Sequence, residues 1–143
     1  MLPHEAAYIA GIFDGEGTVS LNRKHREENR ALIVSISNAE EAMLAYVKRV
    51  TGVGQITNKR VYKEWHTPTK KYLVANRQAL DVLRQIAPYL TTYKKDRARL
   101  ILKYYLDLTP RNGKYSAYLK KRREMFTQRV LRIHPNARPF ARS

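Results

Sequence analysis

Hydrophobic residues recur along the chain with two alternating periods, one of three to four residues and one of two residues. The longer period comes first and predicts a helix over residues 4–14, whose apolar stripe contains Leu2, Ala6, Ile9 and Phe13. Residues 18–24 and 30–37 then alternate between polar and apolar side chains, which predicts the two half-buried strands of a hairpin. The buried face of this hairpin is predicted to contain Val19, Leu21, Leu32, Val34 and Ile36.

The same order of elements is repeated once after the first hairpin. Residues 38–50 have helical periodicity, with Asn38 as the expected N-cap, and the pattern stops before two glycines. Residues 55–65 and 70–75 predict a second hairpin, and a further helix is predicted to begin at Asn76.

Two more helices are predicted near the end of the chain, over residues 93–108 and 115–132. The second is strongly basic, and its predicted apolar stripe contains Tyr118, Leu119, Phe126 and Val130. The complete pattern predicts an α+β fold with elements in the order αββαββα over about residues 4–108. A basic helical extension follows over about 114–143, and we expect residues 1–143 to form a single domain.

The charge of the chain narrows the choice of partner. There are 28 Lys and Arg against 12 Asp and Glu, a net charge of +16, and the pI is near 10.3. Such an excess suits a polyanion, nucleic acid before an anionic membrane. The basic residues are spread over several elements rather than along one amphipathic helix, which disfavours the membrane. The absence of cysteine excludes disulfides, thiolate zinc sites and the splicing cysteine of an intein.

The hydropathy of the chain predicts neither a membrane span nor an export signal. No apolar run reaches the length of a membrane span, and the opening segment Met1–Glu5 lacks the basic start of a signal peptide. We therefore expect no membrane partner. The expected location is intracellular, in the cytoplasm of a prokaryote or in an organelle.

Two acids interleaved with two glycines follow the first predicted helix, as Asp14-Gly15-Glu16-Gly17. Gly15 and Gly17 are expected to end the helix. A helix C-terminus has a partial negative charge, so a pair of carboxylates there is unfavourable for the helix and attracts a cation. By themselves, these four residues are more typical of a solvated helix end with two surface acids than of a cation site.

The longer segment 9–17, Ile-Ala-Gly-Ile-Phe-Asp-Gly-Glu-Gly, resembles the LAGLIDADG motif of homing endonucleases. The direct matches are Ala10, Gly11, Asp14 and Gly17. The apolar replacements are Ile9, Ile12 and Phe13, and the substitutions common in the family are Gly15 and Glu16. The resemblance implies a four-stranded antiparallel saddle sheet whose concave face lies on DNA. The motif occurs once, as in the homodimeric members of the family.

The resemblance also implies a metal-dependent active site. Glu16 stands at the position of the metal-binding acid and Gly15 at that of an additional carbonyl ligand, while Asp14 is a secondary acid that orients the helix ends. Mg²⁺, or another divalent cation such as Mn²⁺, is the implied cofactor, and Ca²⁺ is expected to bind without supporting cleavage. The implied catalytic residues beside Glu16 are Asn38 and Lys94, with Lys95 as an alternative for the lysine.

Small residues on another face of the first helix suit a close contact with a second copy of the chain. This predicted dimer interface contains Ala7, Ala10 and Gly11. Two-fold symmetry would make the DNA site a pseudo-palindrome, on the order of 20 base pairs from the strand lengths and the spacing of base pairs.

Polar side chains alternate with the buried ones on the predicted strands and are candidates for contact with base edges. Besides the apolar Ile33, the set contains Ser20, Asn22, Lys24, Asn29, Ser35, Ser37, Gln55, Thr57, Lys59, Lys63, Thr69 and Lys71. A solvated sheet face would also be polar, so this pattern alone leaves both interpretations open. The basic excess favours DNA, and phosphate contact is also expected for the cations of the last helix, among them Arg123.

The sequence therefore predicts a site-specific endonuclease that hydrolyses double-stranded DNA as a homodimer. Two alternatives of the same family stay open, a non-cleaving DNA-binding regulator and an RNA maturase that assists intron splicing. A regulator typically lacks the acids, which this chain retains, and nothing in the residues separates RNA from DNA.

Overall fold

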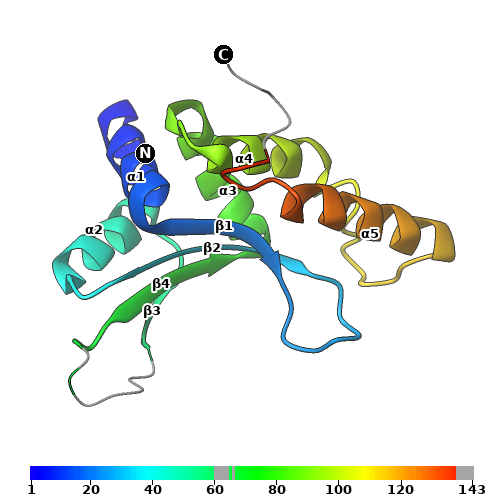
Figure 1. Ribbon diagram of the computed structural model, residues 1–143, viewed down its shortest axis with the longest axis horizontal. Coiled ribbons are helices and arrows are strands. Elements are labelled where there is room, and N and C mark those ends of the chain that lie inside the picture. Colours follow the sequence, from blue (N-terminus) through cyan, green and yellow to red (C-terminus); the bar gives the residue numbers. More distant parts are fainter. Residues whose placement is uncertain (60–64, 66, 138–143) are drawn as a thin grey trace.

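The computed structural model describes residues 1–59, 65 and 67–137. Figure 1 shows four strands with the helices gathered on one side of them. The elements are α1 (Pro3–Glu16), β1 (Gly17–Asn22), β2 (Ala31–Asn38), α2 (Glu41–Thr51), β3 (Gln55–Asn58), β4 (Lys70–Ala75), α3 (Asn76–Ile86), the 3-10 turn η1 (Ala87–Tyr89), α4 (Tyr93–Tyr104) and α5 (Ala117–Leu131). The predicted order αββαββα and the additional C-terminal helices are confirmed.

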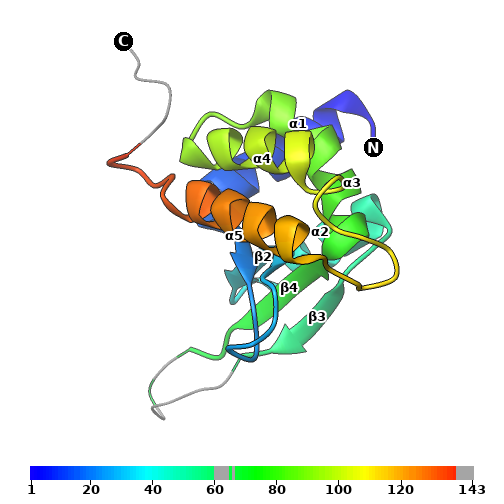
Figure 2. The ribbon, with the colours of Figure 1, turned by 90° about the vertical axis from the view of Figure 1, so that its right-hand side faces the viewer.

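The four strands form one antiparallel sheet in the order β1-β2-β4-β3. Its register places Thr18 opposite Ser35, and Ser37 and Thr57 both opposite Lys71. In both views the helices lie on one side of the sheet, and the other side carries no helix (Figures 1 and 2). We call this second side the outer face.

The core lies between the sheet and the helices, as the alternation of the strands predicts. The sheet contributes Val19, Leu21, Leu32, Val34, Ile36, Tyr72 and Val74, all buried. The helices contribute, among others, Ile9, Phe13, Leu44, Val47, Leu80, Leu83, Ile101, Phe126 and Val130. All the strand residues predicted to be buried in the first hairpin belong to this core.

Helix α1 is longer than predicted, because it continues through Gly15 to Glu16. The N–H of Gly17 donates to the carbonyl of Phe13 and closes the last turn. A Cβ on Gly17 would come within 2.3 Å of a ring atom of Phe13, so this position needs glycine for the close approach of β1 to the helix. Gly17 therefore fixes the change from helix to strand, and Gly15 does not end the helix.

Two strand ends and one helix cap differ from the prediction. β1 ends at Asn22, so Lys24 and Asn29 lie in the connection between β1 and β2. β3 ends at Asn58, and Lys63 lies outside the described residues. Asn38 is the last residue of β2 and does not cap α2, which begins three residues later at Glu41.

The apolar stripe predicted for the last helix is partly wrong. Phe126 and Val130 are buried, but Tyr118 is 72% exposed. Arg123 takes the inward position instead, with only 2% of its surface exposed. Its guanidinium donates to the carbonyls of Leu108 (3.0 Å) and Arg30 (2.8 Å). It therefore connects α5 to the segment after α4 and to the residue before β2, and is not free for phosphate contact.

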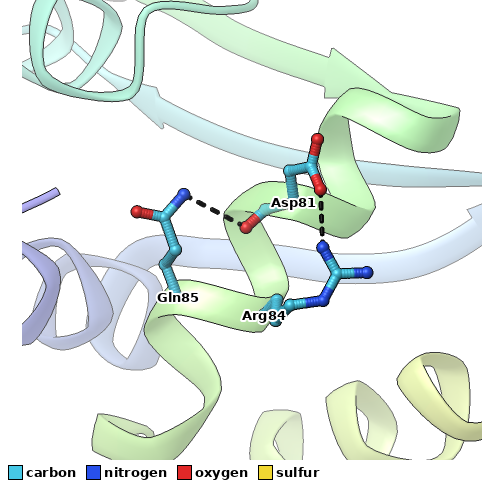
Figure 3. Close-up of polar contacts among 3 residues, drawn as sticks. All are labelled: Asp81, Arg84 and Gln85. Carbon is cyan, nitrogen blue, oxygen red and sulfur yellow. Dashed lines mark hydrogen bonds and ion pairs between the residues drawn. The ribbon is translucent and has the colours of Figure 1, made fainter.

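The exposed side of α3 anchors the start of the chain. Arg84 donates to the carboxylate of Asp81 at 2.6 Å, and the amide of Gln85 donates to the backbone carbonyl of Asp81 at 3.3 Å (Figure 3). The N-terminal ammonium of Met1 donates to the side-chain oxygen of Gln85 at 2.7 Å.

Among the described helices, none combines the length and the apolar character needed to cross a membrane.

Candidate active site at the end of helix α1 and candidate DNA interface

Glu16 is the last residue of α1, and its exposed carboxylate lies where the helix meets the sheet. One carboxylate oxygen accepts a hydrogen bond from the side-chain amide of Asn38, at the adjacent end of β2. The amide oxygen of Asn38 accepts in turn from the backbone N–H of Glu40 at 2.7 Å. This second bond fixes the orientation of the Asn38 amide. Asn38 therefore orients the Glu16 carboxylate through one of its oxygens.

Asp14 is used in a different way from Glu16. Its carboxylate accepts four hydrogen bonds, from the N–H groups of Thr91 (2.9 Å) and Thr92 (3.1 Å) and from their hydroxyls (3.0 and 2.6 Å). Burial tends to raise the pKa of Asp14, but the hydrogen bonds from Thr92 and Thr91 outweigh it and lower the pKa below its ordinary value of 3.8. Asp14 is therefore an ionised anchor at the N-terminus of α4.

Lys94 makes the reciprocal contact. The residue is buried, with 7% of its surface exposed. Its ammonium donates to the carbonyls of Phe13 (2.6 Å) and Asp14 (3.0 Å) at the end of α1. Burial lowers the pKa of Lys94, while the negative charge of Asp14 opposes this shift. The neighbouring Lys95 reaches the carbonyl of Pro88 instead, so Lys94 is the lysine beside the motif.

These contacts join two helix ends of opposite polarity. The negative end of α1 receives the ammonium of Lys94, and the positive end of α4 receives the carboxylate of Asp14. We call the set Asp14, Thr91, Thr92 and Lys94 the helix-end clamp. Sequence reasoning missed the two threonines; a threonine before a helix is a capping signal, but its partner lies 78 residues away.

The outer face contains the strand residues that the sequence assigned to it. Ser20, Asn22, Ile33, Ser35, Ser37, Gln55, Thr57 and Lys71 share this side by register and alternation. Lys59 donates its N–H to the carbonyl of Thr69 at 3.0 Å, which continues the β3–β4 pairing by one step. Ser20 and Ser35 are only 8% and 6% exposed on this face.

The polar side chains of the outer face are left without internal partners. In the described part of the chain, the side chains of Asn22, Ser37, Gln55, Thr57 and Lys71 make no hydrogen bond or ion pair. Lys70, whose side chain is on the opposite parity, pairs with Glu41 instead. The face therefore presents donors and acceptors that are available to another molecule.

The predicted dimer interface needs one correction. Ala7 and Gly11 are exposed on α1, but Ala10 is 0% exposed and packs inside the protomer. Gly15 is exposed one turn beyond Gly11 and completes a line of small residues at steps of four. This line borders an open groove of about 530 Å³ that is also lined by Tyr8, Ile12, Glu16 and Met43.

The described acids of one protomer do not form a complete metal site. Among the described residues there is no group of three or more His, Cys, Asp or Glu side chains that can hold an ion. The exposed carboxylate of Glu16 and the adjacent carbonyl of Gly15 are hard oxygen donors of the kind that Mg²⁺ and Ca²⁺ bind. The donor chemistry fits such a cation, provided that further ligands come from outside the chain.

A family model described as a LAGLIDADG-like domain matches residues 3–87, more than half of the 143 residues. The chain therefore belongs to the LAGLIDADG homing endonuclease family, as the motif predicted. A comparison of the sequence with curated proteins gives no match.

Solved structures of homing endonucleases have the same fold. The homing endonuclease I-CvuI in complex with its target superposes with a TM-score of 0.75 at 16% identity, covering 92% of this chain and 83% of that one. The archaeal intron-encoded I-Vdi141I complexed with DNA gives 0.71 at 19% identity, covering 96% and 89%. I-GzeII in complex with its DNA target gives 0.67 at 14% identity, covering 92% of this chain but 45% of that one. This chain thus spans most of some of these proteins and about half of others.

Proposed function

We propose that this protein is a site-specific endonuclease that hydrolyses both strands of duplex DNA as a homodimer with a divalent cation. The observation that carries the proposal is the different use of the two motif acids. Asp14 is saturated by Thr91 and Thr92, whereas the Glu16 carboxylate is exposed and held on one side by Asn38. An oriented, accessible carboxylate next to an unpaired polar sheet face suits phosphodiester chemistry.

The proposed cofactor is Mg²⁺ or Mn²⁺, held by the carboxylate of Glu16 and the carbonyl of Gly15. When bound, such a cation activates water and stabilises charge on the phosphate. Ca²⁺ is expected to bind without supporting cleavage. The structures of I-CvuI with DNA in the presence of Ca or of Mg support a divalent cofactor in proteins of this fold.

Hydrolysis joins a water oxygen to phosphorus and breaks the bond from phosphorus to a sugar oxygen. The residues of this chain contribute position: Asn38 sets the direction of the Glu16 carboxylate, and the helix-end clamp fixes the end of α1. The Lys94 ammonium is already engaged by two carbonyls. We therefore assign Lys94 a positioning role that acts through α1, in place of the direct catalytic role predicted from the resemblance.

The exposed glycines of α1 support the homodimer. A glycine inside a helix costs about 0.5–1 kcal/mol relative to alanine. A Cβ placed on Gly11 or Gly15 would meet nothing within 4 Å, so the protomer itself gives no packing reason for either glycine. Close approach of helix α1 from a second protomer would give a packing reason for both glycines. A two-fold axis along this face brings the two copies of Glu16 together over the centre of the DNA site.

The outer face is proposed to read the DNA. β2, with 8 residues, is about 26 Å long at ~3.3 Å per residue and spans roughly 8 base pairs of a duplex. Two protomers therefore suit a pseudo-palindromic site on the order of 20 base pairs, including the centre between them. Asn22, Ser37 and Gln55 supply groups that read base edges, and Lys71 supplies charge.

The function is tested by incubating the purified protein with a randomised duplex library and sequencing the ends that appear. Mg²⁺ should produce cuts at one pseudo-palindromic sequence, and chelation of divalent cations should abolish them. Specific enrichment of bound DNA without any cut ends, under Mg²⁺ and Mn²⁺, would instead identify a DNA-binding regulator. Specific binding to RNA alone would identify the maturase alternative.

A further inference from the structure

Basic residues are unevenly divided between the two parts of the chain. Residues 1–92, which include the sheet and α1–α3, contain 13 Lys and Arg against 9 Asp and Glu. Residues 93–143 contain 15 against 3, so their net charge is +12, compared with +4 for the part that builds the sheet. The part of the chain that builds the outer face therefore contains the smaller share of the positive charge.

Part of this charge forms a line along α4. The core-facing side of the helix contains Lys94, Ala98, Ile101 and Tyr105, and the opposite side contains Lys95, Arg99 and Lys103 at steps of four. Arg99 and Lys103 are exposed, and within the described residues none of the three forms an ion pair. α4 packs against β1 on the helix-covered side of the sheet, where Arg97 donates to the carbonyl of Val19 at 2.9 Å, so this line on the other side of α4 faces away from the outer face (Figures 1 and 2).

The line continues onto α5 at Tyr104. The Lys103 ammonium lies 5.3 Å and the Arg129 guanidinium 5.7 Å from the centre of the Tyr104 ring. Hydrogen bonds from Lys103 and Arg129, together with their charges, lower the pKa of the Tyr104 hydroxyl. We call Lys95, Arg99, Lys103 and Arg129 the helix-side basic surface. Arg84 is outside it because it is paired with Asp81 (Figure 3).

The composition of this surface selects the kind of nucleic acid. Its four cations offer charge and no Asn or Gln to read bases, which suits sequence-independent contact with phosphates. Single strands are typically held by open aromatic rings, but the Tyr104 ring is already in contact with two cations. Three residues at steps of four span about 12 Å of helix, on the order of three or four phosphates of one duplex strand.

We propose that the helix-side basic surface binds a second DNA duplex through its phosphates while the outer face holds the first. The inference rests on the proposed binding of DNA by the outer face. Because the two surfaces point in opposite directions, a second duplex can bind before the first is released. The protein then passes directly from one DNA segment to another during its search for a site.

Direct transfer has a kinetic signature that needs no cleavage. The protein is bound to a labelled duplex of mixed sequence in Ca²⁺, and unlabelled duplex is added at increasing concentrations. With two surfaces, the release rate of the labelled duplex should rise in proportion to the concentration of added DNA. A triple variant Lys95→Gln/Arg99→Gln/Lys103→Gln should release the label at a rate independent of that concentration. Its affinity for the first duplex should stay within about twofold of wild type, because the removed charges face away from the outer face and salt screens exposed charges.

A matched variant, Arg111→Gln/Lys114→Gln/Lys120→Gln, removes the same charge from exposed positions outside the surface and should keep the concentration dependence. The six substituted side chains are exposed, apart from Lys95, which is half-buried. Circular dichroism should therefore show that both variants are folded. Release of wild type that does not depend on added DNA would overturn the proposal. Equal loss of the concentration dependence in both variants would also overturn it. So would acceleration of release by duplex RNA but not by duplex DNA. Failure of the wild type to bind the labelled duplex at all would reject the proposed function instead.

Discussion

The end of α1 and the outer face of the sheet are adjacent, and their polar groups are arranged in opposite ways. At the end of α1, Asp14 and Lys94 make six hydrogen bonds with backbone and side chains about 80 residues away. On the outer face, side chains such as Asn22 and Gln55 make none within the described protein. The comparison separates two tasks: the first region fixes the position of Glu16, and the second keeps its groups free for a partner.

The largest effect is expected where the two regions meet, at Glu16. Glu16→Gln keeps the size of the side chain and one oxygen that can accept from Asn38, but removes the ligand charge. Cleavage in Mg²⁺ should fall by roughly 10³-fold or more, because metal stabilisation of the transition state is worth several kcal/mol. DNA affinity should stay similar or rise. Single-turnover cleavage and equilibrium binding measure the two quantities, and cleavage at the wild-type rate would remove Glu16 from the proposed site.

The next effect tests whether the clamp positions Glu16. Lys94→Met removes the ammonium from the carbonyls of Phe13 and Asp14 while keeping an unbranched side chain. Cleavage should fall by about 10²-fold, the cost of a small misplacement of a catalytic group. Affinity of the DNA complex for Ca²⁺, measured by calorimetry, should weaken at the same time.

Lys95→Met is the matched control, since Lys95 reaches Pro88 instead of the motif; cleavage, Ca²⁺ affinity and thermal stability should all stay close to wild type. A purely chemical role for Lys94 predicts a different result, namely slower cleavage with unchanged Ca²⁺ affinity. That outcome would contradict the positioning role.

A change on the outer face should leave stability and chemistry intact. Asn22→Ala removes an exposed side chain that has no hydrogen bond in the protein. Discrimination between base pairs at one position of each half-site should weaken by about 1–3 kcal/mol. Binding to a set of duplexes with single substitutions measures this loss. Equal weakening across all substituted duplexes would mean that Asn22 contributes only to general affinity.

The smallest effect is a pH dependence from Asp14. Its folded pKa is depressed, so its contribution to the free energy of unfolding is present above its ordinary value of 3.8 and is lost as the pH falls through the folded pKa. Asp14→Asn should be less stable than wild type by about 1–2 kcal/mol at neutral pH. This difference should shrink below about pH 4. Urea unfolding at several pH values tests it, and a constant difference would show that the carboxylate charge is not involved.

The two regions also differ in how well the sequence predicts them. Alternation along a strand is local, so the buried residues Val19, Leu21 and Val34 and the outward parity of Asn22 and Gln55 followed from the pattern alone. The motif placed Glu16 at the end of its helix. The family match and the fold confirm what the motif implied about the architecture.

The errors lie where distant contacts override local rules. Gly15 is predicted to end the helix, but tertiary contacts with Thr91, Thr92 and Lys94 hold this helix end in place and the helix continues for two more residues to Glu16. Ala10 reads as part of a small-residue face, but only the packed structure shows that it points into the core. Arg123 reads as a surface cation, because no local pattern reveals its carbonyl partners at Leu108 and Arg30.

The central claim is that two copies of Glu16 act together over one DNA site, and mixed dimers test it most directly. Wild-type chains and Glu16→Gln chains with a distinguishable tag are mixed, and the hybrid dimers are purified and given the site recovered from the library. The account predicts that hybrid dimers bind this DNA as the wild type does but do not cut both of its strands. Double-strand cleavage by the hybrids at the wild-type rate would contradict it.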